Sequence, residues 1–381
     1  MDFQGGHAAG YVFLQIENGM GVHKENVKKT EIVIVGGGPA GAWCAFMLAR
    51  SGAQVSLAHW AGYAPGGIEL VSGRARRVIE QHCPVFFHGA APGVEVHETI
   101  SLWSTPEPVA WSTMFNPWGP GVAVERSLFD HALRDLARTA GVEVLVDTKV
   151  MGIEPRDDNW ELSMRMGEDN NLSLRAEFVV LATGRAATPF FDRPPAPESA
   201  KLALMTSLPS RDDEPRHALY VESTSSGWWY ALPARNGSSF AGFCVERAEL
   251  KKRGGSLKEF FVEELSRTRL LAPLLPHDSS SVQISGRMAD ARPFDRAAGE
   301  GWLAVGDAAY APDPLSGMGI ELAIASARLG ARATLEAITP LAGANSRGAL
   351  GEYEASMRGL AQEQGKTAAF HYDRLERHLG E

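Results

Sequence analysis

The residues best suited to chemistry begin with a glycine-rich turn early in the chain. Gly36, Gly38 and Gly41 form a G-x-G-x-x-G pattern, with Ala40 beside the last glycine. In such a pattern the first glycine permits a tight turn and the second lets the backbone approach a pyrophosphate. The third lets a helix pack closely on a strand. The N-terminus of that helix attracts phosphate charge. The spacing therefore predicts a dinucleotide-binding turn.

The elements that must position this turn are present on both sides of it. Residues 32–35 are a β-branched run typical of a buried parallel strand, residues 42–50 have a helical pattern, and residues 54–58 form a second strand. His59 ends that second strand, where an acidic residue usually binds the ribose hydroxyls. A neutral imidazole can accept the same hydrogen bond. His59 is therefore a candidate cofactor-binding residue, and a solvent-facing loop histidine is the alternative.

Two further motifs lie at the ends of later strands. The strand expected at 177–182 leads into the tripeptide A-T-G, and the strand expected at 302–305 leads into Gly306 and Asp307. After six more residues a proline precedes a second glycine pair, from which a helix of small residues begins. The residues of this last stretch are Pro314, Gly317, Met318 and Gly319.

Together the three motifs resemble the FAD-binding fold of group A flavoprotein monooxygenases, flavin-dependent halogenases and geranylgeranyl-reductase-like enzymes, over most of residues 30–340. The resemblance implies an α/β fold, in which a Rossmann-like, p-hydroxybenzoate-hydroxylase-like FAD-binding domain carries an inserted antiparallel-sheet substrate domain. It also implies that Asp307 accepts from the ribityl chain and that amides near Gly317 stabilise reduced flavin. The residues expected to bind FAD are Gly36, Gly38, Ala40, Gly41, His59, Arg126, Asp307, Pro314, Gly317, Met318 and Gly319.

Two segments favour one branch of these families. Residues 313–320, D-P-L-S-G-M-G-I, resemble a motif typical of tryptophan-halogenase-like and quinone-cofactor-maturation flavoproteins. Residues 227–233 resemble the halogenase W-x-W-x-I-P element, with Tyr230 in place of the second tryptophan. The resemblance makes Trp228 and Tyr230 candidate substrate-binding residues; the alternative is that they only pack within a strand.

Halogenation is disfavoured because the catalytic lysine of those halogenases has no counterpart between Lys29 and Lys149, and arginine cannot replace it. The resemblance then implies an FAD-dependent monooxygenase that hydroxylates an aromatic ring through a C4a-hydroperoxyflavin formed with O₂. The ring expected is a tryptophan of a partner polypeptide during quinone cofactor biogenesis. Candidates for a catalytic base are His59 and Glu69. Alternatives are a halogenase-like enzyme, a geranylgeranyl-reductase-like enzyme and a non-catalytic flavin-binding assembly factor.

Two sources of electrons for the flavin are compatible with the sequence. The chain has no second G-x-G-x-x-G, so we expect reduction by transient NAD(P)H or by a partner flavin reductase. The 381 residues carry a net charge of −9, 44% hydrophobic residues and three dispersed cysteines. This composition argues against a nucleic-acid surface, a disulfide framework and a metal site, and it favours the cytoplasm. No apolar run reaches the length of a membrane span.

The chain divides into units that alternate along the sequence. Residues 1–29 are expected to be a flexible extension, with Met1 or Met20 as the start of translation. The FAD-binding domain is expected to take in 30–93, 122–190 and 285–345, the substrate domain 94–121 and 191–284, and a helical tail 346–381.

Overall fold

The computed structural model describes residues 28–60, 66–167, 170–185, 200–209, 217–253, 255–274, 282–292, 296–339 and 346–380. Most of the expected flexible extension lies outside these ranges, but Lys28 and Lys29 already pair in a strand. The helices are α1 (Pro39–Arg50), α2 (Gly73–Glu80), α3 (Arg126–Thr139), α4 (Arg247–Arg253), α5 (Leu257–Ser266), α6 (Gly319–Ile338) and α7 (Ser346–Gly380). The short 3₁₀ turns are η1 (Thr113–Phe115), η2 (Ala272–Leu274), η4 (Gly306–Ala308) and η5 (Pro314–Ser316).

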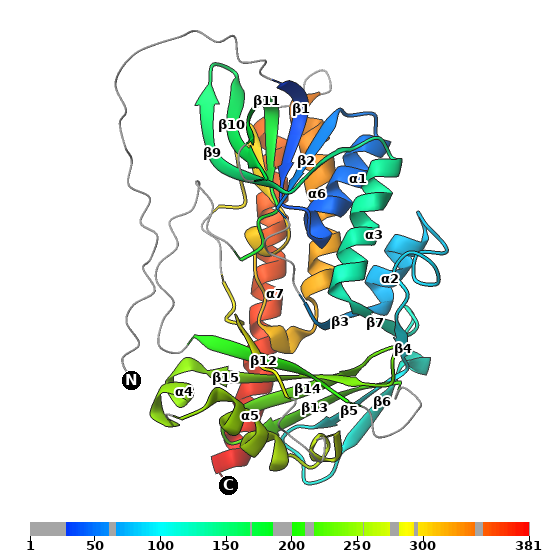
Figure 1. Ribbon diagram of the computed structural model, residues 1–381, viewed down its shortest axis with the longest axis vertical. Coiled ribbons are helices and arrows are strands. Elements are labelled where there is room, and N and C mark those ends of the chain that lie inside the picture. Colours follow the sequence, from blue (N-terminus) through cyan, green and yellow to red (C-terminus); the bar gives the residue numbers. More distant parts are fainter. Residues whose placement is uncertain are drawn as a thin grey trace.

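A mainly parallel sheet forms the upper layer of Figure 1, with α1, α3 and α6 beside it. Its order is β17-β18-β11-β1-β2-β8, and only the β17–β18 pair along this path is antiparallel. The parallel arrangement explains why the strand of residues 32–35 is apolar throughout, since helices and sheet bury both of its faces. The strands are β1 (Lys28–Val35), β2 (Val55–His59), β8 (Glu143–Val146), β11 (Asn170–Leu181), β17 (Ala298–Gly299) and β18 (Trp302–Ala304).

An antiparallel hairpin extends this sheet beyond what the sequence analysis anticipated. It consists of β9 (Thr148–Arg156) and β10 (Asn159–Met166), and β10 pairs with the first part of β11. Asp157 turns the hairpin with a φ of +52°. Aspartate tolerates this left-handed conformation better than most residues do.

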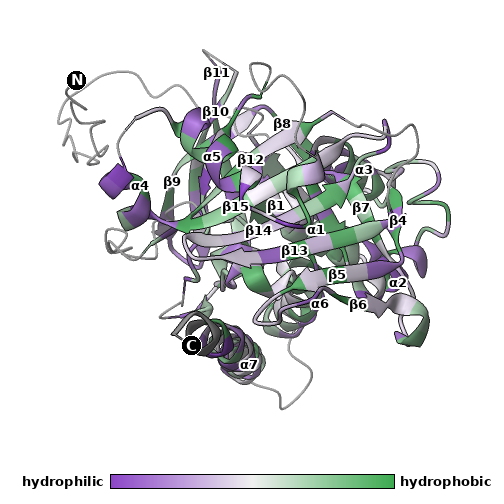
Figure 2. Cartoon of the chain, turned by 90° about the horizontal axis from the view of Figure 1, so that it is seen from below, coloured by the Kyte–Doolittle hydropathy of each residue, from purple (hydrophilic) through white to green (hydrophobic). Residues whose placement is uncertain are grey.

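A seven-stranded sheet lies below in Figure 1, and in Figure 2 its strands cross the molecule side by side. Its order is β16-β12-β15-β14-β13-β5-β6. The expected antiparallel arrangement needs one correction, because β13 and β5 run parallel. β16 also takes this sheet past the expected boundary at residue 284. The strands are β5 (Glu98–Leu102), β6 (Val109–Ser112), β12 (Lys201–Leu208), β13 (Ala218–Thr224), β14 (Gly227–Pro233), β15 (Ser239–Glu246) and β16 (Ser285–Met288).

A small antiparallel sheet connects the two layers. It contains β3 (Ile68–Val71), β4 (Val94–Val96) and β7 (Gly121–Glu125), with β7 in the centre. Its apolar side chains pack against Leu232 of β14. Because β7 leads directly into α3, this contact sets the position of the first residues of α3 relative to the lower sheet.

The segment expected to be a helical tail forms α7, which runs along both layers (Figure 1). Leu350, Tyr353 and Met357 of α7 are buried in the core of the upper layer. Further along the helix, Tyr372 packs in a cluster with Trp228 of the lower sheet. Among the helices of the described ranges, none is long and apolar enough to cross a membrane.

Candidate functional site

The glycine-rich turn has two positions at which any side chain would collide with the backbone. Gly36 has a φ of +112°, and a Cβ there would lie 2.2 Å from the carbonyl oxygen of Ala182. A Cβ on Gly41 would lie 1.9 Å from the carbonyl oxygen of Gly36. Glycine at these two places lets β1, β11 and α1 approach one another closely.

Gly38 differs, because a Cβ at this position would meet no atom within 4 Å. It is the N-cap of α1, and its backbone is extended. A Cβ on Gly317 or Gly319, at the start of α6, would likewise meet no atom within 4 Å. The two helix starts are close together, since a Cβ on Gly306 would lie 2.7 Å from Ala40 of α1 and 3.9 Å from the Cβ of Ala323 in α6.

His59 lies beside the same turn. A Cβ on Gly37 would come within 2.8 Å of the His59 side chain, and Nη1 of Arg134 donates to the carbonyl oxygen of Gly37 at 2.9 Å. Burial, together with the nearby cations Arg134 and Arg138, lowers the pKa of His59 to about 4. The imidazole is therefore neutral at pH 7 and can accept a hydrogen bond.

Arg126 is held by two carboxylates at the start of α3. Nε and Nη2 donate to the two carboxylate oxygens of Asp130 at 3.0 and 2.9 Å, and Nη1 donates to Oε1 of Glu69 at 2.6 Å. Asp130 is only 4% exposed, and burial raises its pKa. The fork geometry fixes the guanidinium between α3 and β3.

Asp307 follows β18 and faces Arg185, which follows β11. Nε of Arg185 donates to Oδ2 of Asp307 at 3.1 Å, and the other two nitrogens donate to the carbonyl oxygens of Asp290 and Pro312. Burial raises the pKa of Asp307, Arg185 opposes this, and the charge of Glu69 adds to it. Glu69 is therefore close enough to Asp307 for its charge to act on the pKa of Asp307.

The residues around the two helix starts fit FAD. Space is open beside Gly38, Gly317 and Gly319, so a ligand has room to approach the backbone there. Oγ1 of Thr183, in the A-T-G tripeptide, is buried and has no hydrogen-bond partner among the described residues. The start of α1 suits a diphosphate, and the start of α6 suits the charge of reduced flavin. In the described ranges no group of acidic, histidine and cysteine side chains could hold a metal ion.

Trp228 and Tyr230 lie side by side on β14, with ring centroids 6.0 Å apart. They belong to one apolar cluster with Ile68 of β3 and Leu315 of the loop before α6. Burial raises the pKa of the Tyr230 phenol, and so does the charge of Glu69. This cluster therefore connects the lower sheet to the loop that precedes α6.

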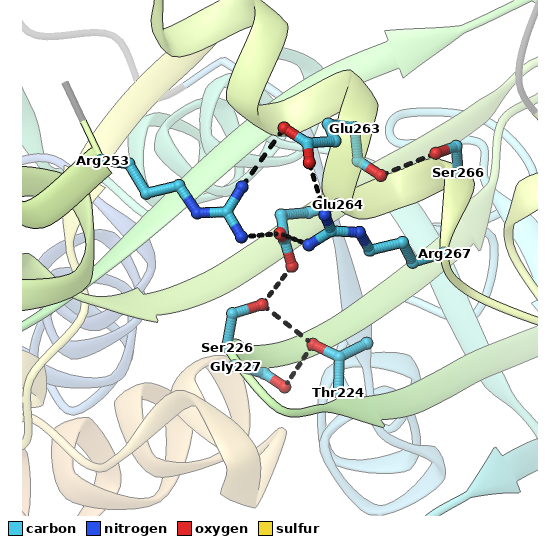
Figure 3. Close-up of polar contacts among 8 residues, drawn as sticks. All are labelled: Thr224, Ser226, Gly227, Arg253, Glu263, Glu264, Ser266 and Arg267. Carbon is cyan, nitrogen blue, oxygen red and sulfur yellow. Dashed lines mark hydrogen bonds and ion pairs between the residues drawn. The ribbon is translucent and has the colours of Figure 1, made fainter. Parts of the chain in front are cut away.

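A buried carboxylate supports the start of β14 from the other face of the lower sheet. Glu264 of α5 is 1% exposed, and its Oε1 accepts from Arg267 at 2.5 Å and lies 3.3 Å from Nη2 of Arg253. Ser226, in the turn before β14, donates to its other oxygen (Figure 3). The pairing offsets the cost of burying this charge and fixes the turn from which β14 begins.

The structure separates the two residues considered as a catalytic base. Glu69 lies near Arg126, Asp307 and Tyr230, whereas His59 packs on the glycine-rich turn. Three residues that no sequence motif predicts lie in contact with residues of the flavin motifs: Arg185, Lys201 and Tyr372. Only Arg185 had a local signal, because it directly follows the A-T-G tripeptide.

Comparisons with known proteins show what this chain is similar to. The profile of the FAD dependent oxidoreductase family matches residues 31–188. The digeranylgeranylglycerophospholipid reductase of Methanoculleus marisnigri is 26% identical over 336 residues, covering 86% of this chain and 81% of the reductase. Residues 31–188 are therefore similar to an FAD-dependent oxidoreductase, and the relatives support an enzyme.

Solved structures share the fold of this chain. The peptidyl tryptophan dihydroxylase QhpG, essential for tryptophylquinone cofactor biogenesis, has a TM-score of 0.74 and 25% identity, covering 93% of this chain and 77% of QhpG. The myxobacterial chondrochloren halogenase CndH has a TM-score of 0.79 and 20% identity, covering 91% and 83%. The expected α/β class with a Rossmann-like FAD-binding fold is confirmed.

Proposed function

We propose that this protein is a monooxygenase that hydroxylates an aromatic ring, and that the ring is a tryptophan carried by a partner polypeptide. The observation that carries the proposal is the aromatic cluster around Trp228 and Tyr230, which contacts Leu315 of η5, the turn that precedes α6. The likeness to QhpG, a peptidyl tryptophan dihydroxylase, supports the choice of substrate.

FAD, when bound and reduced, would supply the electrons that activate O₂. The backbone at Gly38 and the start of α1 would hold its diphosphate, and the start of α6 would stabilise its negative charge. Trp228 and Tyr230 would orient the substrate ring and exclude water from it. NAD(P)H or a partner flavin reductase would deliver the electrons.

Glu69 is the candidate for accepting the proton that the hydroxylated ring releases. It is near Tyr230 and accepts a hydrogen bond from Arg126. His59 is a poorer candidate, since it lies beside the glycine-rich turn and not in the aromatic cluster. Both assignments require a kinetic test, which is the pH dependence of turnover in Glu69→Gln and His59→Gln.

The test of the proposed function is the mass of the product. FAD-loaded protein is reduced, mixed with O₂, and given N-acetyl-L-tryptophanamide or a tryptophan-containing peptide, with and without bromide. We expect a mass increase of one or two oxygen atoms, a preference for the peptide, and no effect of bromide. A brominated product would favour the halogenase alternative and contradict this proposal.

The second candidate function is reduction of isoprenoid double bonds, favoured by the 26% identity to digeranylgeranylglycerophospholipid reductase over most of both chains. The discriminating reaction is anaerobic, because a reductase needs no O₂. If reduced protein adds two hydrogens to a geranylgeranyl lipid without O₂, and oxygenates no aromatic compound, the monooxygenase proposal is wrong.

A further inference from the structure

Tyr372 of α7 lies within the aromatic cluster of β14. Its hydroxyl oxygen accepts a hydrogen bond from Nε1 of Trp228 at 3.1 Å and donates one to Oδ1 of Asp313 at 3.0 Å. An indole nitrogen can only donate and a carboxylate can only accept. The directions of both hydrogen bonds are therefore fixed, and the single phenol proton is committed to Asp313.

Asp313 is well anchored at the other end of this chain of hydrogen bonds. It is 7% exposed, its Oδ1 also accepts from the backbone nitrogen of Leu315 at 2.9 Å, and its Oδ2 accepts from Nζ of Lys201 at 2.8 Å. The same ammonium lies 3.7 Å from the centre of the Tyr372 ring, which is a favourable cation–π distance. Lys201 therefore holds both the ring and its carboxylate partner.

A second tryptophan ties α7 to the lower sheet. Nε1 of Trp103, directly after β5, donates to the carbonyl oxygen of His371 at 3.1 Å. Its ring centroid lies 6.2 Å from that of Trp228 and 6.4 Å from that of Tyr372. β5, β14 and α7 therefore meet at one point, and α7 forms part of the surroundings of Trp228.

We propose that Tyr372 is a positioning residue that fixes the indole ring of Trp228 and links it, through Asp313, to the loop before α6. The part assigned to Trp228 in substrate binding rests on the proposed function, whereas the link itself rests on the hydrogen bonds. Packing alone would need only the ring of Tyr372. The hydroxyl is the group that satisfies the N–H of the buried Trp228.

The test that does not depend on turnover compares wild type with Tyr372→Phe, both loaded with FAD and labelled with ¹⁵N-tryptophan. Trp228→Phe identifies the indole resonance of Trp228. We expect Tyr372→Phe to shift that resonance upfield and to speed its exchange with deuterium about tenfold or more, with FAD affinity within about twofold of wild type. The control is Tyr353→Phe, which removes another α7 hydroxyl, one bonded to Ala304, and should leave the Trp228 resonance in place. An unchanged resonance in Tyr372→Phe would overturn the inference.

The second measurement is the yield of oxygenated N-acetyl-L-tryptophanamide per flavin oxidised. We expect Tyr372→Phe to lower this yield about fivefold, the equivalent of one lost hydrogen bond. In Trp228→Phe there is no indole N–H for the Tyr372 hydroxyl to bind. Adding Tyr372→Phe to this variant should therefore lower the yield no further. Independent, additive losses would overturn the link between the two residues. If wild type yields no oxygenated product at all, the proposed function fails, and the indole resonance still decides whether Tyr372 fixes Trp228.

Discussion

Arg185 and Asp307 join two parallel strands at their carboxyl ends through a hydrogen bond of 3.1 Å between Nε and Oδ2. Arg185 follows β11 and Asp307 follows β18, and these strands are direct neighbours. The pair therefore joins the A-T-G tripeptide to the G-D motif across 122 positions of sequence. A ribityl hydroxyl that bonds to Asp307 would meet a carboxylate already oriented by a guanidinium.

Asp307→Asn is expected to weaken FAD retention, because it removes the charge from this hydrogen bond. A charge-assisted hydrogen bond is worth about 1.5–3 kcal/mol, so affinity should fall about tenfold to a hundredfold. Fluorescence titration of the apoprotein with FAD measures the change. The matched control is Asp157→Asn in the β9–β10 turn, where affinity should be unchanged. Equal affinities for the two variants would remove Asp307 from the FAD site.

Valine at two positions of the glycine-rich turn should affect two different properties, FAD binding and the fold. Gly38→Val places a side chain in open space beside the start of α1, so the fold should persist while FAD binding is lost. Gly41→Val forces a Cβ to within 1.9 Å of a backbone oxygen, so the fold itself should fail. Circular dichroism and flavin absorbance distinguish the two effects. Flavin bound normally by Gly38→Val would contradict the assignment of the diphosphate site.

His59 should make stability depend on pH in a defined direction. Its pKa is lowered to about 4, so the folded protein binds the imidazole proton less tightly than the unfolded chain does. As the pH falls from about 6.5 towards about 4, the unfolded chain gains a proton that the folded protein does not, and stability is lost. Tm should therefore drop more for wild type than for His59→Gln between about pH 7 and about pH 5. His88→Gln replaces an exposed histidine that does not act on His59; it is the control and should behave as wild type.

Gly242→Ala offers a way to move Tyr230 without replacing it. A Cβ on Gly242 would lie 2.2 Å from Cε1 of Tyr230, so the ring must shift. We expect more hydrogen peroxide and less oxygenated product per flavin oxidised, at unchanged FAD affinity, since the ring no longer excludes water. Gly286→Ala in the same sheet, where the nearest atom to a new Cβ is 3.5 Å away, should retain full coupling. Normal coupling in both variants would argue against a substrate role for Tyr230.

The sequence could predict the local parts of this molecule. The strand, the turn and the helix around Gly38 follow from glycine geometry and hydrophobic pattern within twenty residues. The parallel pairing of β13 with β5 could not be predicted, because alternation of apolar residues is the same in parallel and antiparallel edge pairs. The β9–β10 hairpin was missed although β10 carries a clear signal, since Trp160, Leu162, Met164 and Met166 alternate with polar residues.

The side-chain contacts of the candidate site could not be predicted from the sequence either. The sequence has no lysine between Lys29 and Lys149, yet Lys201 at the start of β12 reaches Asp313. Tyr372 lies 59 positions after Asp313 on a helix with no motif. Contacts of this kind depend on how the layers pack, and no spacing within the sequence encodes them.

The place of Tyr372 along the chain has a consequence for biosynthesis. Domains generally fold from the N-terminus as the ribosome makes them, but Leu350, Tyr353 and Met357 of α7 complete the core of the upper layer. Tyr372, further along the same helix, meets Trp228 of the lower sheet. Neither the upper layer nor the aromatic cluster is therefore complete until α7 has been made.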